Sequence, residues 1–472
     1  MTDTPLAHNI AEKAAQHGPE VTQNVSILFA VLLVAMIVTL ALEEKLHAKK
    51  SLIVGVYAVV ALLMGAAFGI LPFGAVTMPN GHHIEMPVFI PSIDWGVICI
   101  IVGSSIFVDV TSRSGLFTWI AIKLTKLSKG DPLKLLWYYG LMTVVFSAVL
   151  NNVTAMIIVG SLTGVSLGKL GKKDLLLGFL LIEGLLTNIG GLLTLISSVP
   201  NIIVGNAAGI SFMTFFIKAS PYVVVATIIT LIMGAKLFKI KKLATEEEKA
   251  EAEKLVSGFD ENDGIESKGF FNFATVMLLL FIIFIASTSQ LPWIKELGMG
   301  FVALMFAVIM MIRYKSEVDQ FYKSIDWDLI IFFMALFAVI NVMEHALVLD
   351  LIGQGIDVIK GDKENMFGTG ALLLSASVFS SVTDNIPLAA MLAKILVAGG
   401  TPSDSPLWWA VIFGANLGGN LTPIGSASTL VAVTIIHKNK LNMSFASFVK
   451  MAAPFAVIQI ALAIIYVLVF LR

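Results

Sequence analysis

The sequence has 472 residues, of which 57% are hydrophobic and only 13% are charged. A soluble domain of this size needs far more polar surface, so we expect most of the chain to lie in lipid. The formal net charge of −1 gives no reason to expect nucleic acid as a partner, and the single cysteine, Cys99, excludes disulfides within the chain and thiolate metal sites.

Residues 1–24 are polar and predict a solvated N-terminal tail without a cleavable signal peptide. A helix needs about 20 apolar residues to cross a bilayer, so the remaining sequence predicts about ten crossings. The continuous ones lie near 25–42, 51–71, 93–111, 219–235, 270–288, 296–312, 328–346 and 449–471. Two more crossings, 175–206 and 408–435, contain Gly, Asn, Thr and Pro, which predict broken helices.

Two other apolar stretches, 135–167 and 366–397, each have a polar break at the middle and predict hairpins that enter the membrane and return. Lysines follow the first and fifth crossings and flank the first hairpin, whereas the loops 72–92 and 398–407 contain neither Lys nor Arg. The positive-inside rule therefore predicts a multi-pass inner-membrane protein with both termini external. The charged segment 237–269 is expected to be a cytoplasmic linker that contains a short helix.

The two halves of the chain, 25–236 and 270–472, repeat each other. The matching segments are Ser92–Trp95 with Ser324–Trp327, Phe146–Val153 with Phe379–Ile386, and Asn188–Gly191 with Asn416–Gly419. Their spacings of 232, 233 and 228 residues are nearly equal. An odd number of crossings separates the two hairpins, so the hairpins must enter from opposite faces. The fold class that follows is an all-α polytopic membrane protein with two inverted repeats, which is the usual plan of alternating-access carriers.

The turns of the hairpins and the breaks in the helices are the candidate ion- or substrate-binding site. Irregular backbone at membrane depth survives only inside protein or beside a wet cavity. Amide, hydroxyl and carbonyl oxygens suit a cation such as sodium, and the helix N-termini after the turns suit an anion. The predicted binding residues are Asn151, Asn152, Thr154, Asn188, Thr194, Ser198, Thr383, Asp384, Asn385, Asn416, Thr422 and Ser426. Sodium is expected at Asn152, Asp384 and Asn385. The alternative is that these residues only cap helices and pack.

Four acids in apolar surroundings are candidates for proton coupling, because an acid whose pKa is raised by burial can exchange a proton for a cation. They are Asp384, Glu344, Asp109 and Glu183. The alternative for the last three is a structural acid near a membrane face. There is no P-loop, zinc helix or serine-nucleophile motif, so we expect neither an enzyme nor a cofactor other than the coupling ion, Na+ or H+.

The polar motifs resemble those of the ion transporter superfamily that includes arsenical pumps, NhaD-type sodium/proton antiporters, the melanosomal P protein and the divalent-anion/sodium symporters. Phe146–Thr154 and Ser381–Leu388 are similar to its two hairpins, and Thr187–Val204 and Gly414–Leu430 to its two broken helices. The resemblance implies an elevator-type carrier, often a homodimer, that binds a small ion or anion at the tips and breaks.

The expected function is secondary active ion transport, with sodium/proton antiport first. Arsenite or oxyanion efflux is the second interpretation, favoured by the stretch Thr422–Ser426 (TPIGS), which is similar to arsenical pumps. A sodium-coupled organic-anion symporter is the third, although the Ser-Asn-Thr signature of the carboxylate symporters is absent from both tips. A channel is the alternative from a different class. It is disfavoured because inverted repeats with two offset hairpins fit the two gates of a carrier better than an open pore.

Overall fold

A computed structural model describes residues 21–77, 81–360 and 366–471, so most of the predicted N-terminal tail lies outside the described residues. The chain forms two compact units. The first contains the described residues up to Trp95 together with Trp327–Asp357, and the second contains Gly96–Asp326 and Val358 onward.

The first unit is built from helices and one small hairpin of strands. Its elements are α2 (Gln23–Ala41), α3 (Glu43–Leu46), α4 (Lys50–Ala67), β1 (Ala75–Thr77), β2 (His83–Glu85), α16 (Trp327–His345) and most of α17 (Val348–Lys360). Helix α4 packs against both α2 and α16, and the Ser51 hydroxyl donates a hydrogen bond to Asp328 across the α4–α16 contact.

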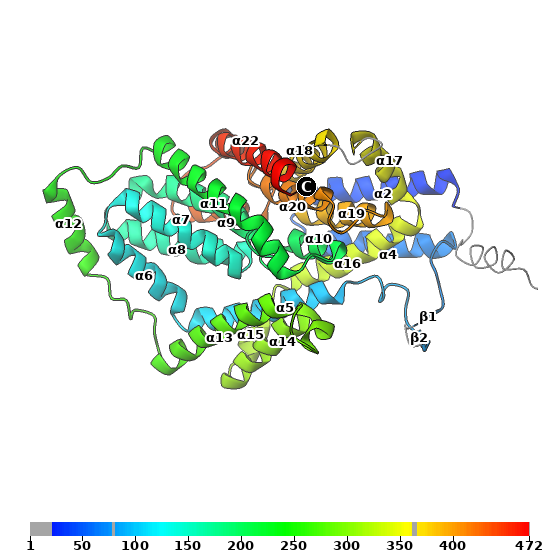
Figure 1. Ribbon diagram of the computed structural model, residues 1–472, viewed down its shortest axis with the longest axis horizontal. Coiled ribbons are helices and arrows are strands. Elements are labelled where there is room, and N and C mark those ends of the chain that lie inside the picture. The colour runs from blue at the N-terminus through cyan, green and yellow to red at the C-terminus, as the bar shows by residue number, and fades with distance from the viewer. Residues whose placement is uncertain (1–20, 78–80, 361–365, 472) are drawn as a thin grey trace, which may run out of the picture. The chain divides into compact units, whose positions relative to one another are not determined.

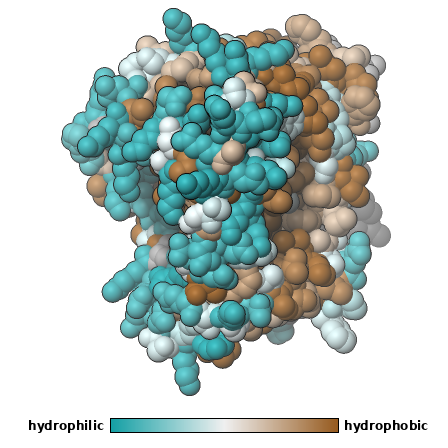
Figure 2. All heavy atoms as spheres, turned by 90° about the vertical axis from the view of Figure 1, so that its left-hand side faces the viewer, coloured by the Kyte–Doolittle hydropathy of each residue, from teal (hydrophilic) through white to brown (hydrophobic). Residues whose placement is uncertain are grey.

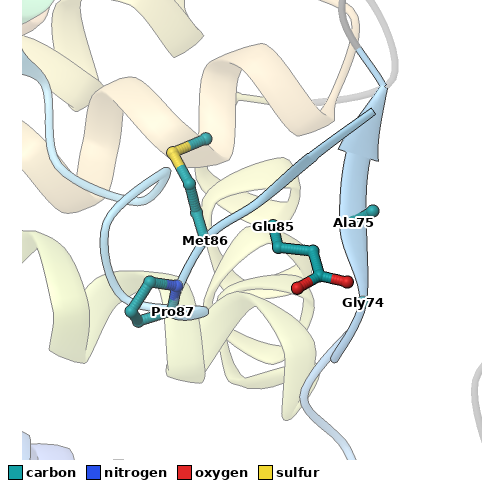
Figure 3. A pocket seen from close by; sticks show the side chains of 5 residues that line it. All are labelled: Gly74, Ala75, Glu85, Met86 and Pro87. Carbon is teal, nitrogen blue, oxygen red and sulfur yellow. The ribbon is translucent and has the colours of Figure 1, made fainter. Parts of the chain in front are cut away.

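The strands correct the all-helical expectation for this part of the chain. They pair antiparallel with Val76 opposite Ile84, and Thr77 Oγ1 lies 3.0 Å from His83 Nδ1. This side-chain contact and the backbone pairing both join β1 to β2. A shallow pocket lies beside the strands, lined by Gly74, Ala75, Glu85, Met86 and Pro87 (Figure 3). It contains none of the predicted binding residues.

The second unit contains the remaining helices (Figure 1). In its first part these are α5 (Trp95–Arg113), α6 (Leu116–Ser128), α7 (Pro132–Val149), α8 (Asn152–Lys169), η1 (Lys173–Leu175), α9 (Leu176–Gly191), α10 (Val199–Ala208), α11 (Phe212–Leu237), α12 (Glu246–Ser257), α13 (Lys268–Ser287), α14 (Ile294–Arg313) and α15 (Val318–Ser324). In its second part they are α18 (Met366–Val382), α19 (Asn385–Ala398), α20 (Pro406–Gly418), α21 (Ala427–Lys438) and α22 (Phe445–Phe470).

Ten helices of the described chain are long and apolar enough to cross a membrane. They include all the predicted continuous crossings; the remaining two are Pro132–Val149 and Lys173–Gly191, whereas α20 and α21 are shorter. Helices α11 and α22 begin seven and four residues before the predicted apolar runs, because Ser211 and Ser444 accept hydrogen bonds from the first-turn amides of Thr214 and Ser447.

Burial separates central helices from peripheral ones in the second unit. In an 18-residue apolar stretch of Lys173–Gly191, which comprises η1 and α9, 83% of the residues are buried. In the corresponding stretch of α13 only 22% are buried. Peripheral helices present large apolar side chains outward, for example Leu279 and Ile283 of α13. An apolar exterior around a helical core is what lipid requires, and the enclosed α9 can carry polar side chains that lipid would not tolerate.

The charged segment between the halves is docked rather than loose. Its helix α12 begins with a capping box between Thr245 and Glu248. Downstream, Glu261 receives hydrogen bonds from Lys123 at 2.6 Å and Lys126 at 2.9 Å, both on α6. We name residues 243–267 the strap. Figure 2 shows the face of the second unit that carries α12, where hydrophilic residues gather.

Candidate functional site

Two helix pairs of the second unit meet at short polar turns. Helix α7 ends at Val149 and α8 begins at Asn152, while α18 ends at Val382 and α19 begins at Asn385. The residue before each second helix is its N-cap: Asn151 Oδ1 accepts from the Thr154 amide at 2.8 Å, and Asp384 Oδ1 accepts from the Ile386 amide at 3.0 Å. Capping is therefore one role of these two side chains.

Two further helices are interrupted, and each break is tied to one hairpin. The first lies between α9 and α10, and the second between α20 and α21. Thr194 in the first break donates to the carbonyl of Ala148, and Thr422 in the second break donates to the carbonyl of Ser381. Each threonine hydroxyl thus satisfies a carbonyl at the end of the arm that leads into a tip, where a helix leaves acceptors unpaired.

One serine of each hairpin donates a hydrogen bond to a backbone carbonyl of the broken helix beside it. Ser147 donates to the Thr187 carbonyl at 2.6 Å, and Ser380 donates to the Ala415 carbonyl at 2.6 Å. Ser380 follows Ser147 by the 233 residues that separate the two hairpins in the sequence. The two halves therefore use the same residue type for the same contact.

Close packing at the breaks depends on glycine. A Cβ atom on Gly190 would lie 2.7 Å from the Val144 carbonyl oxygen, and one on Gly418 would lie 2.2 Å from the Ser377 carbonyl oxygen. Real Cβ atoms do not approach carbonyl oxygens so closely, so glycine is required for each broken helix to touch its hairpin.

The short helix after each break packs against the hairpin of the other half. Helix α10 packs against α19, and α21 packs against α8. Two reciprocal hydrogen bonds join the broken helices: Ser198 donates to Asn416 Oδ1 at 2.7 Å, and Asn188 donates its side-chain amide to Ser426 Oγ at 2.9 Å. All four side chains are buried. The breaks therefore form one polar centre shared by both halves.

Asn188 makes four side-chain hydrogen bonds in this centre and is fully buried. Its Oδ1 accepts from Asn152 Nδ2 at 3.3 Å and from Ser428 Oγ at 3.1 Å. Its amide also donates to Asn420 Oδ1 at 2.8 Å. Asn188 thus connects the first hairpin tip with the second break.

Behind this centre lies a polar chain that the sequence reasoning missed. Asn420 Nδ2 donates to Gln459 Oε1 at 2.8 Å, and Gln459 Nε2 donates to Thr230 Oγ1 at 2.9 Å. The Tyr222 hydroxyl donates to the Gln459 carbonyl at 2.9 Å. The sequence contains a signal for this polar chain, because Gln459 is the one amide side chain in the otherwise apolar run 451–471.

The predicted binding residues all lie in the second unit, but not all share contacts. The side chains of Asn152, Asn188 and Ser426 form one connected group, and Ser198 pairs with Asn416. Thr383, directly after α18, instead donates to the carbonyl of Phe379 in that helix at 2.8 Å. Asn385, at the start of α19, is buried. Among the described residues, no group of three His, Cys, Asp or Glu side chains could hold a metal ion.

The acids predicted for proton coupling have different surroundings. Asp109 faces Arg113, with 3.3 Å between Oδ2 and Nη2, and Arg113 also contacts Glu317 at 3.7 Å. This pairing supports the structural alternative for Asp109. Glu344 is half-buried in α16 of the first unit. Glu183 is fully buried in α9, where Thr163 donates to its Oε1 at 2.6 Å.

Comparisons with known proteins agree on a class. A family model described as a citrate transporter (CitMHS) matches residues 55–414. An uncharacterized transporter of Mycobacterium tuberculosis is 30% identical over 383 residues, covering 79% of this chain and 86% of that protein. An uncharacterized transporter of Synechocystis is 25% identical over 469 residues, covering 94% and 97%.

The human P protein is 24% identical over 510 residues, which cover 91% of this chain and 60% of that protein. Among solved structures, the YdaH transporter of Alcanivorax borkumensis superposes with a TM-score of 0.58 at 11% identity, covering 90% of this chain and 98% of that chain. At this identity the likeness concerns the fold alone.

Proposed function

The chain belongs to the citrate transporter family (CitMHS) and is a transport protein rather than an enzyme; from this premise we propose that it is a secondary active ion transporter that works by alternating access. The observation that carries the proposal is the doubled polar centre. Two tips and two breaks make equivalent contacts, and reciprocal bonds join Asn188 to Ser426 and Ser198 to Asn416. A carrier that opens to either face needs such a paired arrangement.

The proposal includes the inverted repeats. Their support is the recurrence of contacts at the repeat spacing: Ser147 with Thr187 and Ser380 with Ala415. An elevator movement, a homodimer, an inner-membrane location with external termini, and the division 1–24, 25–236, 237–269 and 270–472 belong to the same proposal. They rest on the sequence patterns and on the resemblance described above.

We propose sodium/proton antiport as the first candidate function. The tips and breaks, residues 146–154, 187–204, 379–388 and 414–430, contain no Lys, Arg or His, but they contain Asp384 and many amide and hydroxyl oxygens. Hard cations prefer oxygen ligands of this kind, so Asp384 with Asn152 and Asn385 would bind the cation. Among the four acids, Asp384 alone lies at a tip.

Transport of an organic anion is the second candidate. The description of the family as citrate transporters favours it. The N-termini of α8 and α19, at Asn152 and Asn385, present the positive ends of helix dipoles, which suit a carboxylate in the absence of basic side chains. Arsenite efflux has no comparable support among the relatives described above.

A proteoliposome assay separates these functions. The protein is reconstituted with a pH-sensitive dye inside, a pH gradient is imposed, and sodium, lithium, potassium or citrate is added; uptake of labelled citrate is followed in parallel. Antiport predicts that sodium or lithium dissipates the gradient, and that Asp384→Asn abolishes the response. The matched control is Asp404→Asn, which neutralises an exposed acid in the loop before α20.

Citrate uptake without any cation response would replace the first candidate by the second. A response of Asp384→Asn equal to that of the wild type would remove the assigned cation site. The absence of ion or citrate flux from correctly inserted protein would contradict secondary transport itself.

A further inference from the structure

Among the described acids of the second unit, Glu183 is the most deeply buried, and one of its two carboxyl oxygens has no hydrogen-bond partner. The side chain is fully buried on α9, and Thr163 of α8, also fully buried, donates to Oε1 at 2.6 Å. Oε2 is buried as well and has no hydrogen-bond partner among the described residues. A buried polar atom without a partner is rare in native proteins and requires an explanation.

The helices around Glu183 supply no compensating charge. Its neighbour Gly184 is pressed against α21, because a Cβ there would lie 2.7 Å from the Ala432 Cβ. The elements α7, α8, η1, α11 and α21 pack against α9. In the described structure, none of their basic or acidic side chains forms an ion pair with Glu183. These side chains are Lys134, Lys169, Lys173, Asp174, Lys218, Lys236, His437 and Lys438.

An ionised carboxylate in this position would be an uncompensated buried charge, which is far more costly than a neutral carboxyl. A protonated carboxyl keeps Oε1 as the acceptor for Thr163 and carries its hydrogen on Oε2. The surroundings of Glu183 therefore accommodate the neutral form and not the charged one.

The contact partner of Glu183 links it to the binding site. Thr163 lies on α8, the helix that begins at the first tip, and Glu183 lies on α9, the helix that ends at the first break. The Asn152–Asn188 bond joins these same two helices. A movement of the tip against the break would change the Glu183–Thr163 contact together with the binding centre.

From this geometry we propose that Glu183 is the proton-binding site of the transporter: it carries a proton while α8 and α9 are packed as observed, and releases it when they separate. The inference rests on the proposed transport function and deepens it. Asp384 holds the transported cation and Glu183 holds the exchanged proton. One proton leaves as one carboxylate forms, and no other covalent bond changes.

A chain of hydroxyl groups offers a route toward Glu183. The Tyr139 hydroxyl lies 2.8 Å from Thr125 Oγ1 and 2.7 Å from Ser166 Oγ. Ser166 is three residues after Thr163 on α8, so both side chains lie on one helix face. Thr125 lies near the C-terminal end of α6. The chain thus leads from that end of α6 into the helices that hold Glu183.

Infrared spectroscopy of the intact protein in lipid tests the site directly. A protonated carboxyl has a C=O stretch that an ionised one lacks, and Glu183→Gln keeps the shape of the neutral side chain while removing that band. We expect a carboxyl band in the wild type that is absent from Glu183→Gln, and that loses intensity at high pH or when sodium is added. Superimposable spectra of the two proteins under all conditions would overturn the proposal.

Flux measurements supply the second readout. Glu183→Gln should retain sodium exchange at equal pH on both sides but lose sodium movement driven by a pH gradient. Thr163→Val, which removes the donor to Oε1, should shift the pH dependence of transport, whereas Thr163→Ser should restore it. Tyr139→Phe should slow proton flux.

Wild-type behaviour of Glu183→Gln in the gradient assay would refute the inference while leaving transport intact. A wild type that moves no ion would refute the proposed function, and the infrared titration by pH alone would still decide whether Glu183 binds a proton.

Discussion

The side-chain amide of Asn188, in the first broken helix, donates a hydrogen bond to the hydroxyl of Ser426, at the second break, over 2.9 Å. These residues are far apart in the sequence, and both are buried. The bond means that neither half of the chain can complete its polar centre without the other. Ser198 and Asn416 repeat the relationship in the opposite sense.

Removing the Asn188 side chain should damage both stability and transport. Asn188→Ala removes the partner of the half-buried Asn152 Nδ2 and of the buried Asn420 Oδ1, and leaving a buried polar group unsatisfied costs about 1–3 kcal/mol. We expect a lower free energy of unfolding in detergent and loss of flux. The control Asn206→Ala, at an exposed position of α10, should change neither.

A double-mutant cycle isolates the bond itself. Asn188→Ala, Ser426→Ala and the double variant should give a coupling free energy of about 0.5–3 kcal/mol, as residues in one hydrogen-bond network do. Additive effects of the two substitutions on the free energy of unfolding would show that the contact does not join the breaks.

Adding a methyl group at the second break should separate it from its hairpin. In Gly418→Ala the new Cβ would meet the Ser377 carbonyl oxygen at 2.2 Å, so the backbones must move apart. Overpacking of this kind costs about 1–3 kcal/mol, and we expect lower thermal stability and slower transport. Gly55→Ala is the control, because a Cβ at that helical position meets nothing within 4 Å. Equal effects of the two variants would contradict the close contact.

Gln459 should act as a positioning residue for Asn420. Gln459→Leu preserves the approximate size of the side chain but leaves Asn420 Nδ2 and Thr230 Oγ1 without this partner. We expect destabilisation of about 1–3 kcal/mol and a changed apparent affinity for the transported ion. Gln290→Leu, at an exposed position after α13, is the matched control for the loss of an amide. Wild-type affinity in Gln459→Leu would limit the residue to a structural role.

The strap should release in acid. Hydrogen bonds from Lys123 and Lys126 hold the pKa of the Glu261 carboxyl below its usual value. A carboxyl with a lowered pKa stabilises the docked state above its ordinary pKa, and this stabilisation is lost as the pH falls through the lowered value. After correction for the intrinsic pH dependence of amide exchange, the protection of α12 against hydrogen exchange should therefore be high at neutral pH and lower in acid or at high salt. Glu261→Gln should exchange faster at neutral pH, and Glu266→Gln should not; equal exchange in both would argue against docking through Glu261.

The interruptions of the helices were readable from the sequence, because Gly, Pro and Asn act locally. Asn151 and Asp384 each directly precede a helix, and Gly191 and Gly418 end helices. Other features depend on tertiary contacts that no local pattern reports. The exchange of α10 and α21 between the halves is one of these, and the docking of Glu261 on α6 is another.

Short helices were also missed for a physical reason. Helix α6 and helix α17 have 13 residues each, too few to cross a bilayer, so a search for spans passes over them. Polar side chains inside long apolar runs also indicate buried contacts, which the prediction of membrane crossings did not consider. Gln459 and Thr230 lie in such runs and hold the polar centre from behind.

Thiol labelling at the two tips tests most directly whether both belong to one transport site. Cys99 is the single native cysteine, so a Cys99→Ser background permits one new cysteine at a time, first in Asn151→Cys and then in Thr383→Cys. The rate of labelling is measured with and without the ion that the flux assay identifies. We predict that this ion slows labelling at both positions, because both turns reach a common centre. Protection at one tip only, or at neither, would contradict the account.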